Sequence, residues 1–197
     1  MKFSVRDNNF YIDDKKIFLN SGEIHYFRIR RELWDRHLDE AVNAGLKAVS
    51  TYVPWAWHEE EEGMFDFDGS TCSEKDLNGW LRKCKEHGLH AIVKPGPFIL
   101  AEFRGAGLPD WFLNRYGEEV RMRTRRGTRV IIDGVSLFNE DYLNKVRMWY
   151  DKVMPVIAKH ELQAGGPVIM MQGCNEIGVF SWLARQADYG NKVREKF

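Results

Sequence analysis

The sequence predicts an α/β fold of the (β/α)8 TIM-barrel type, and this chain carries about the first four β/α units of such a barrel. Short apolar runs alternate with longer segments whose apolar residues recur at helical spacing, which is typical of a parallel sheet with right-handed crossovers. Polar residues also gather directly after each run, as they do at the rim of a barrel. Since no linker or low-complexity segment divides the 197 residues, residues 1–197 read as one unit.

The amino-terminal elements follow from hydrophobic spacing and from residues that end helices and strands. Residues 3–12 predict a short antiparallel pair that turns at residues 7–9. The run 16–24 predicts the first parallel strand. Residues 31–44 predict the helix after it, because their apolar side chains share one helical face and a glycine follows. Residues 46–53 then predict the second strand, which a proline ends.

The later elements are predicted in the same way. Residues 76–87 form an amphipathic helix closed by glycine, and residues 89–94 form the third strand, which Pro-Gly-Pro interrupts. A long loop rich in glycine and arginine is predicted over residues 97–136. Asn139 is then expected to cap a helix, and residues 168–172 predict the fourth strand, buried on both faces.

The segment after the fourth strand is the most informative part of the chain. Asn175 and Glu176 follow this strand, ahead of a last helix predicted from about residue 181. Catalytic residues lie at the carboxyl ends of strands in barrels and open parallel sheets. A carboxylic acid beside an amide donor therefore indicates a general acid/base. Polar side chains also follow the earlier runs, namely Glu23, His25, Tyr52, His58 and Glu102.

Composition excludes several classes of function. Lys plus Arg and Asp plus Glu each number 29, so the balanced charge favours neither nucleic acid nor a charged membrane surface. No apolar window reaches membrane-spanning length. The three cysteines form no metal or disulfide pattern, which indicates a reducing, cytoplasmic compartment and no metal or other cofactor.

Four further features have a structural interpretation beside a functional one. The acidic run 59–62 beside His58 reads as a solvated loop and not as a metal site. The arginines of residues 121–129 read as an exposed loop or hairpin and not as a phosphate site. His25 is expected to be a hydrogen-bonded support under the rim. The tryptophans of residues 55–57 could belong to the core or line a sugar-sized pocket, and the sequence leaves both open.

Five blocks of the sequence, in order and across nearly the whole chain, resemble glycoside hydrolase family 35, the β-galactosidase family of retaining enzymes. They are residues 21–28, 50–55, 94–103, 107–111 and 165–169. The resemblance implies that the chain is the amino-terminal half of a glycoside hydrolase TIM-barrel catalytic domain. It also implies hydrolysis of terminal β-galactosyl residues, with a β-galactoside carbohydrate as the binding partner.

The resemblance also implies roles for individual residues. Glu176 matches the general acid/base, and Asn175 matches the amide that bonds a sugar hydroxyl beside the reacting carbon. Tyr52, Ala101 through its backbone, and Glu102 match the residues that hold the galactose hydroxyls. If the carboxylates of Glu102 and Glu176 approach, each disfavours ionisation of the other, which would keep Glu176 protonated as an acid.

The chain departs from the family in two ways. Cys174 stands where the family has an acidic residue, so weaker hydrogen bonding around Glu176 is expected. The family's nucleophile is a glutamate late in the barrel, and no residue of this chain matches it. An open half barrel would also expose strand edges and favour self-association. The alternatives are therefore part of a β-galactosidase, a non-catalytic carbohydrate-binding relic or fragment, or another retaining glycosidase of the same barrel clan, which would not explain the matching blocks.

Overall fold

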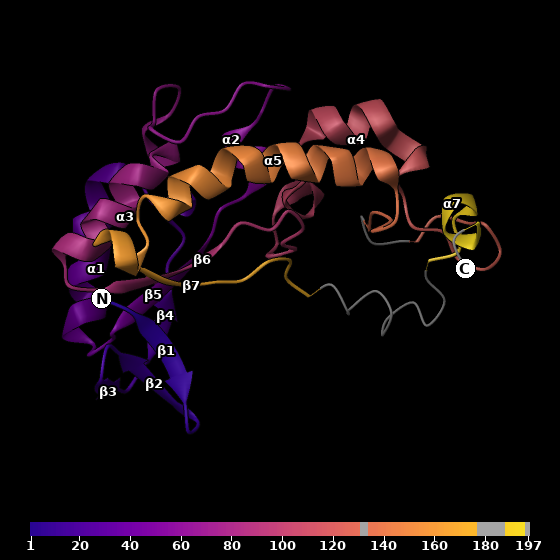
Figure 1. Ribbon diagram of the computed structural model, residues 1–197. Coiled ribbons are helices and arrows are strands. Elements are labelled where there is room, and N and C mark those ends of the chain that lie inside the picture. Colours follow the sequence, from indigo (N-terminus) through magenta and orange to yellow (C-terminus); the bar gives the residue numbers. More distant parts are fainter. Residues whose placement is uncertain (131–133, 177–187, 196–197) are drawn as a thin grey trace.

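The structure is a computed structural model that describes residues 1–130, 134–176 and 188–195. Within these residues the strands form two sheets, shown in Figure 1. One is a three-stranded antiparallel sheet of order β1-β2-β3, and the other is a four-stranded sheet of order β4-β5-β6-β7. Every neighbouring pair in the second sheet is parallel. This sheet carries the candidate site.

The antiparallel sheet consists of β1 (Phe3–Arg6), β2 (Asn9–Ile12) and β3 (Lys15–Ile17). The predicted hairpin is confirmed, and Asp7 and Asn8 at its turn have positive φ of 50° and 57°, as a tight two-residue hairpin turn requires.

The predicted first parallel strand, residues 16–24, is wrong as one element. Its start belongs to β3 in the antiparallel sheet, and its end forms β4 (Ser21–Glu23) in the parallel sheet. The two are separated because the carbonyl of Asn20 accepts hydrogen bonds from the backbone of Lys47 and Ala48, which draws the chain over to the parallel sheet.

The central strands of the parallel sheet are β5 (Ala48–Tyr52) and β6 (His90–Lys94), and β7 (Val168–Met171) lies at one edge. The side chains of β5 and β6 are mostly buried, which matches the near-continuous apolar runs expected of parallel strands. The second to fourth predicted strands are thus confirmed, but the prediction that the fourth is buried on both faces is wrong, because β7 lies at the sheet edge and its Met171 is 49% exposed. The β6–β7 pairing shifts register between Ala91 and Ile92, so an irregularity interrupts the ladder there.

The helices that connect the strands are α1 (Trp34–Asn43), α3 (Leu77–Glu86) and α5 (Glu140–Ala158). All three match the predicted amphipathic segments. Strand order follows chain order without reversal, so right-handed crossovers place these helices on the same face of the sheet. Figure 1 shows α3 and α5 on one side of the strands.

The predicted loop over residues 97–136 contains a helix that sequence analysis missed, α4 (Asp110–Tyr116). Pro109 precedes this helix, an aspartate lies in its first turn, and Gly117 with positive φ ends it. Its Phe112 is fully buried, so the helix is part of the core. The last predicted helix begins at about residue 181, which lies outside the described residues. After that gap, the structure describes the short helix α7 (Asn191–Arg194).

Aromatic rings are the largest fully buried side chains of the core, and Trp55, one of the two tryptophans whose place the sequence left open, is among them. Trp55 is 1% exposed and stacks on Trp149 with ring centres 6.1 Å apart. Trp55 therefore belongs to the core, whereas Trp57 is only half-buried. Within the described residues, no helix combines the length and apolar character needed to cross a bilayer.

Candidate active site

The carboxyl ends of β4, β5 and β6 meet in a cluster of polar groups. Parallel pairing sets Glu23 opposite Ser50 and Tyr52 opposite Lys94. The Lys94 ammonium forms an ion pair with Glu23 and lies 4.2 Å from the centre of the Tyr52 ring. Lys94 is only 8% exposed, so both contacts offset the cost of burying its charge. The result is a fixed orientation for the Tyr52 ring.

Two other predicted site residues, Glu102 and Glu176, contribute to the electrostatic environment of Tyr52. Burial raises the pKa of Tyr52 above its usual range, and the carboxylate of Glu23 raises it further. The carboxylates of Glu176 and Glu102 raise the same pKa. This influence is consistent with the prediction that Tyr52, Glu102 and Glu176 belong to one site.

His25 lies beside this hollow, with its ring centre 5.2 Å from that of Tyr52. Burial lowers the pKa of His25, so its imidazole is neutral at pH 7. Its Nδ1 is buried without a hydrogen-bond partner among the described residues. His25 therefore supports the rim by ring packing and not, at Nδ1, by the predicted hydrogen bond.

The turn that carries Ala101 and Glu102 has an unusual backbone. Leu100, Ala101 and Glu102 have φ of 50°, 52° and 48°, in the left-handed region that costs about 1–2 kcal/mol per non-glycine residue. Arg28 Nη2 donates to the Ala101 carbonyl at 2.5 Å and helps to hold the turn. Such outliers concentrate at functional sites. The turn leaves the Glu102 side chain exposed.

Asn175 joins the exit of β7 to the exit of β6. Its backbone N–H donates to Phe98 O at 2.9 Å, and its Nδ2 donates to Ile99 O at 3.0 Å. Gln172 Nε2 donates to Asn175 Oδ1 at 3.1 Å. One Nδ2 hydrogen and one lone pair of the amide remain for a ligand. Glu176 follows, exposed and with φ of 53°.

Cys174 occupies the position where the family resemblance implies an acidic residue. It is half-buried against the core, and burial raises its pKa, so the thiol is neutral at pH 7. Burial raises the pKa of Tyr150 to about 12, and Cys174 adds to this effect. The Tyr142 hydroxyl is buried without a hydrogen-bond partner among the described residues. Cys174 thus supplies no charge next to Asn175 and Glu176.

Sequence analysis missed two residues of this site, Lys94 and Gln172. Lys94 ends a buried strand, and a charged residue at that position was a readable signal of a polar rim. Gln172 gave no signal, because its role depends on the conformation of the following turn.

The acidic run 59–62 after His58 was predicted to be a solvated loop, and this prediction is wrong for its first residue, Glu59. Glu59 is 2% exposed and accepts hydrogen bonds from Trp55 Nε1 at 2.5 Å and Gly63 N at 2.7 Å. Glu62 is neutralised by Lys145, whose Nζ lies 2.6 Å away. These acids hold the loop against the core. Among the described residues, no group of three or more His, Cys, Asp or Glu side chains could hold a metal ion.

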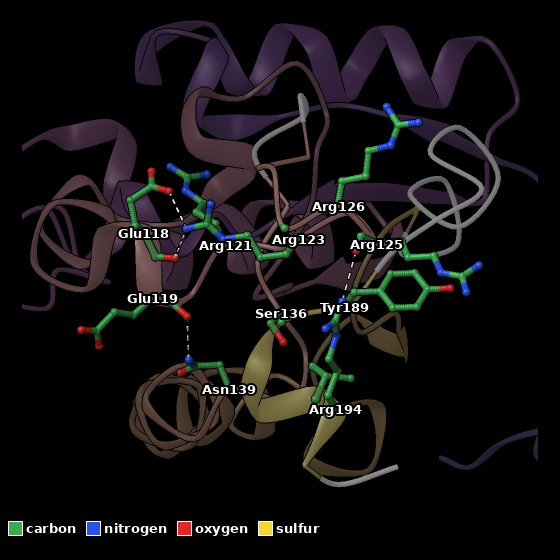
Figure 2. A pocket seen from close by; sticks show the side chains of 13 residues that line it. Glu118, Glu119, Arg121, Arg123, Arg125, Arg126, Ser136, Asn139, Tyr189 and Arg194 are labelled. Carbon is green, nitrogen blue, oxygen red and sulfur yellow. Dashed lines mark hydrogen bonds and ion pairs between the residues drawn. The ribbon is translucent and has the colours of Figure 1, made fainter.

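The arginine-rich segment forms a hairpin, as predicted. Arg121 bridges to Val135 and Arg123 to Arg129, beside a cavity of about 720 Å³. Figure 2 shows Arg125 and Arg126 extending away from Arg121 and Arg123, and Arg123 pairs with Glu118 at 2.7 Å. Glu118 pairs with both Arg123 and Arg129, so a carboxylate of the protein already compensates these two arginines, which agrees with the predicted hairpin and not with a phosphate site.

Comparison with known proteins identifies the family. The family model "Glycosyl hydrolases family 35" matches residues 9–197. The chain belongs to glycosyl hydrolases family 35. This family membership confirms the predicted resemblance, and it accounts for a polar rim at the ends of parallel strands.

Curated relatives match over most of this chain. A β-1,2-glucosyltransferase of Ignavibacterium album is 48% identical over 176 residues, which is 89% of this chain and 25% of that protein. An exo-β-D-glucosaminidase of Pyrococcus horikoshii is 35% identical, over 86% of this chain and 22% of that protein. A β-galactosidase of Felis catus is 34% identical, over 100% of this chain and 26% of that protein. The chain thus spans about a quarter of the length of these relatives.

Solved structures confirm the fold type. The β-galactosidase of the psychrophilic Marinomonas ef1 matches with a TM-score of 0.63 at 14% identity, over 82% of this chain and 22% of that one. The β-galactosidase of Halorubrum lacusprofundi matches with a TM-score of 0.63 at 20% identity, over 81% and 22%. Together with family membership, these matches support a TIM-barrel region formed by the parallel sheet and its helices.

Proposed function

We propose that this chain provides the acid/base and the galactose-holding part of a retaining β-galactosidase-type site, which removes terminal β-galactosyl residues. The observation that carries the proposal is the pair of hydrogen bonds by which Asn175, beside Glu176, binds the segment between β6 and Glu102, at the carboxyl ends of neighbouring parallel strands. Membership of family 35 supports it. The (β/α)8 barrel, of which residues 1–197 are the amino-terminal half, belongs to the same proposal.

Each residue has one proposed task. Glu176 protonates the oxygen of the leaving group, and in the second step it takes a proton from water. The free Nδ2 hydrogen of Asn175 bonds the hydroxyl beside the reacting carbon. Tyr52, the Ala101 carbonyl and Glu102 hold the remaining hydroxyls of the galactosyl ring. The carbonyl of Ala101 still has a free lone pair after it accepts from Arg28.

The nucleophile is assigned to no residue of this chain. A retaining enzyme needs a second carboxylate about 5–5.5 Å from the acid/base. Glu102 follows the strand next to the one that precedes Glu176, but it is proposed to hold hydroxyls. We therefore expect this chain by itself to bind galactosides without turning them over. This outcome would agree with the alternative proposal, a non-catalytic carbohydrate-binding relic or fragment.

Turnover of nitrophenyl β-galactoside, measured beside galactose binding, separates these proposals. Binding without turnover supports the binding fragment or relic. Turnover that Glu176→Gln abolishes, while the exposed control Glu32→Gln keeps it, supports a complete catalytic site. If the chain shows neither binding nor turnover, both proposals are contradicted.

A second candidate substrate is a β-glucosyl unit. The specific observation is the 48% identity to a protein named β-1,2-glucosyltransferase. Glucose and galactose differ in the orientation of one hydroxyl, so the hydroxyl-holding residues Tyr52 and Glu102 would discriminate between them. Titration with methyl β-glucoside and methyl β-galactoside in parallel tests this, and tighter binding of the glucoside would replace galactose with glucose in the proposal.

A further inference from the structure

The segment that follows β6, residues 95–99, is buried along its whole length although it belongs to no strand. Buried backbone carbonyls need hydrogen-bond donors. The donors of this segment come from outside the regular ladder of the sheet. The residues that supply them therefore determine where the segment lies.

Two adjacent side chains of α5 supply the donors at the start of the segment. Trp149 Nε1 donates to Pro95 O at 2.8 Å, and the Tyr150 hydroxyl donates to Gly96 O at 2.5 Å. A carbonyl oxygen only accepts, so the hydroxyl is the donor in the second bond. Burial raises the pKa of Tyr150 to about 12, and the hydroxyl therefore keeps its proton at pH 7. The helix α5 thus holds the first two residues of the segment.

Asn175 binds the carbonyls at the other end of the same segment. Its backbone N–H donates to Phe98 O at 2.9 Å, and its Nδ2 donates to Ile99 O at 3.0 Å. The chain turns tightly between the two ends, because Gly96 has φ of 73° and a Cβ added to it would lie 3.0 Å from Ile99 Cγ2. A displacement of Gly96 is therefore expected to displace Phe98 and Ile99, and with them the Asn175 amide.

We propose that Tyr150 is a positioning residue for the Asn175 amide and acts through the turn of residues 95–99. The inference rests on the proposed function, because the orientation of Asn175 affects a ligand only if this amide binds the sugar. It extends the candidate site to α5, which carries none of the residues predicted for it. Without the Tyr150 hydroxyl, the buried Gly96 carbonyl loses its donor, and the turn must shift to find another.

The side-chain amide signals of Asn175 in nitrogen-15 NMR of the 197-residue chain, assigned with Asn175→Asp, test the proposal without a sugar. Tyr150→Phe removes only the hydroxyl and should shift these signals. Tyr142→Phe is the matched control, because Tyr142 also lies on α5 and its buried hydroxyl has no hydrogen-bond partner among the described residues. Unchanged Asn175 signals in Tyr150→Phe, or equal shifts in both variants, would overturn the proposal.

Calorimetric titration with methyl β-galactoside measures whether this orientation matters for binding. Tyr150→Phe should weaken binding about three- to tenfold, the effect of roughly one hydrogen bond, and Tyr142→Phe should leave it unchanged. In an Asn175→Ala background, Tyr150→Phe should have no further effect, because the side chain through which it acts is gone. A further loss in that background would mean that Tyr150 supports the fold in general, and it would overturn the proposal.

The two measurements separate this proposal from the proposed function. If the wild-type chain does not bind methyl β-galactoside but the Asn175 signals shift in Tyr150→Phe alone, the proposed function is wrong and the positioning of Asn175 by Tyr150 stands. If the sugar binds and neither the signals nor the affinity respond to Tyr150→Phe, only the positioning is wrong. If Asn175→Ala binds too weakly to titrate, the amide signals decide.

Discussion

At the scale of single residues, His58 is a fully buried histidine under the polar rim. Its Nδ1 donates to the carbonyl of Asp66 at 2.5 Å, and its Nε2 accepts from the Tyr26 hydroxyl at 2.5 Å. These two bonds fix the neutral tautomer with hydrogen on Nδ1, because a carbonyl oxygen only accepts. Burial lowers the pKa of His58 from 6.5 to about 4. The residue is thus structural and neutral across the physiological range.

This lowered pKa predicts a specific loss of stability in acid. Between about pH 6.5 and pH 4 the unfolded chain protonates His58 while the folded chain does not, so the free energy of unfolding falls as the pH falls through this window. Urea denaturation at several pH values measures this slope. His58→Gln should be less stable at pH 7 and show a shallower slope. An unchanged slope would contradict the role assigned to His58.

Most of the residues proposed for the site could be predicted from the sequence, because they follow strands that hydrophobic runs make visible. Tyr52, Glu102 and Glu176 are of this kind, and the influence of both glutamates on the pKa of Tyr52 is consistent with that prediction. Lys94 was not predicted, because its role arises from contacts across two neighbouring strands. The burial of Glu59 was not predicted either, because an acidic run carries no sign of which member turns inward.

At the scale of elements, those with a clear local signal could be predicted, and those that depend on distant pairing could not. The helix α5 has a regular apolar face and an asparagine cap, and both are local signals. The division of the predicted run 16–24 between two sheets depends on pairing with distant residues, which no local pattern reveals. The helix α4 is short and lies in a segment rich in glycine and arginine, so its proline start was overlooked.

The cap of α5 gives a prediction at this scale. Asn139 Oδ1 accepts from the backbone N–H groups of Asp141 and Tyr142 at 2.9 and 3.1 Å, and its Nδ2 donates to Glu119 O at 3.1 Å. Asn139→Ala should lower the free energy of unfolding by about 1–2 kcal/mol in urea denaturation. Asn139→Ser should recover much of this loss because it can still cap. Equal losses in both variants would mean that capping is not the stabilising interaction.

At the scale of the whole molecule, the main feature is that each outer strand of the parallel sheet has one edge without a neighbouring strand. Among the described residues, β5 is the only strand beside β4 and β6 is the only strand beside β7, which has one further isolated bridge, from Val168 to Glu161. Large apolar side chains are exposed nearby, with Phe18 82% and Met171 49% exposed. An unpaired edge with exposed apolar side chains can pair with another chain. We therefore propose that the 197-residue chain self-associates through these edges.

Light scattering over a range of concentrations tests this proposal. We expect an average mass above that of the monomer, increasing with concentration. Met171→Lys should reduce association, because a charge on an edge strand disfavours pairing. Met148→Lys is the matched control, since Met148 is 46% exposed on α5 and away from the strand edge. A folded monomer at all concentrations would contradict the proposal.

The central claim is that Tyr52 lies in a galactose-binding hollow shared with Glu102 and Glu176. Calorimetric titration with methyl β-galactoside, comparing the wild-type chain with Tyr52→Phe, tests it most directly. The variant keeps the ring that packs on Lys94 and removes only the hydroxyl, so the fold should be unchanged. We predict saturable binding that the variant weakens about tenfold, as expected for one lost hydrogen bond. Equal affinity in both proteins, or no saturable binding by the wild-type chain, would contradict the claim.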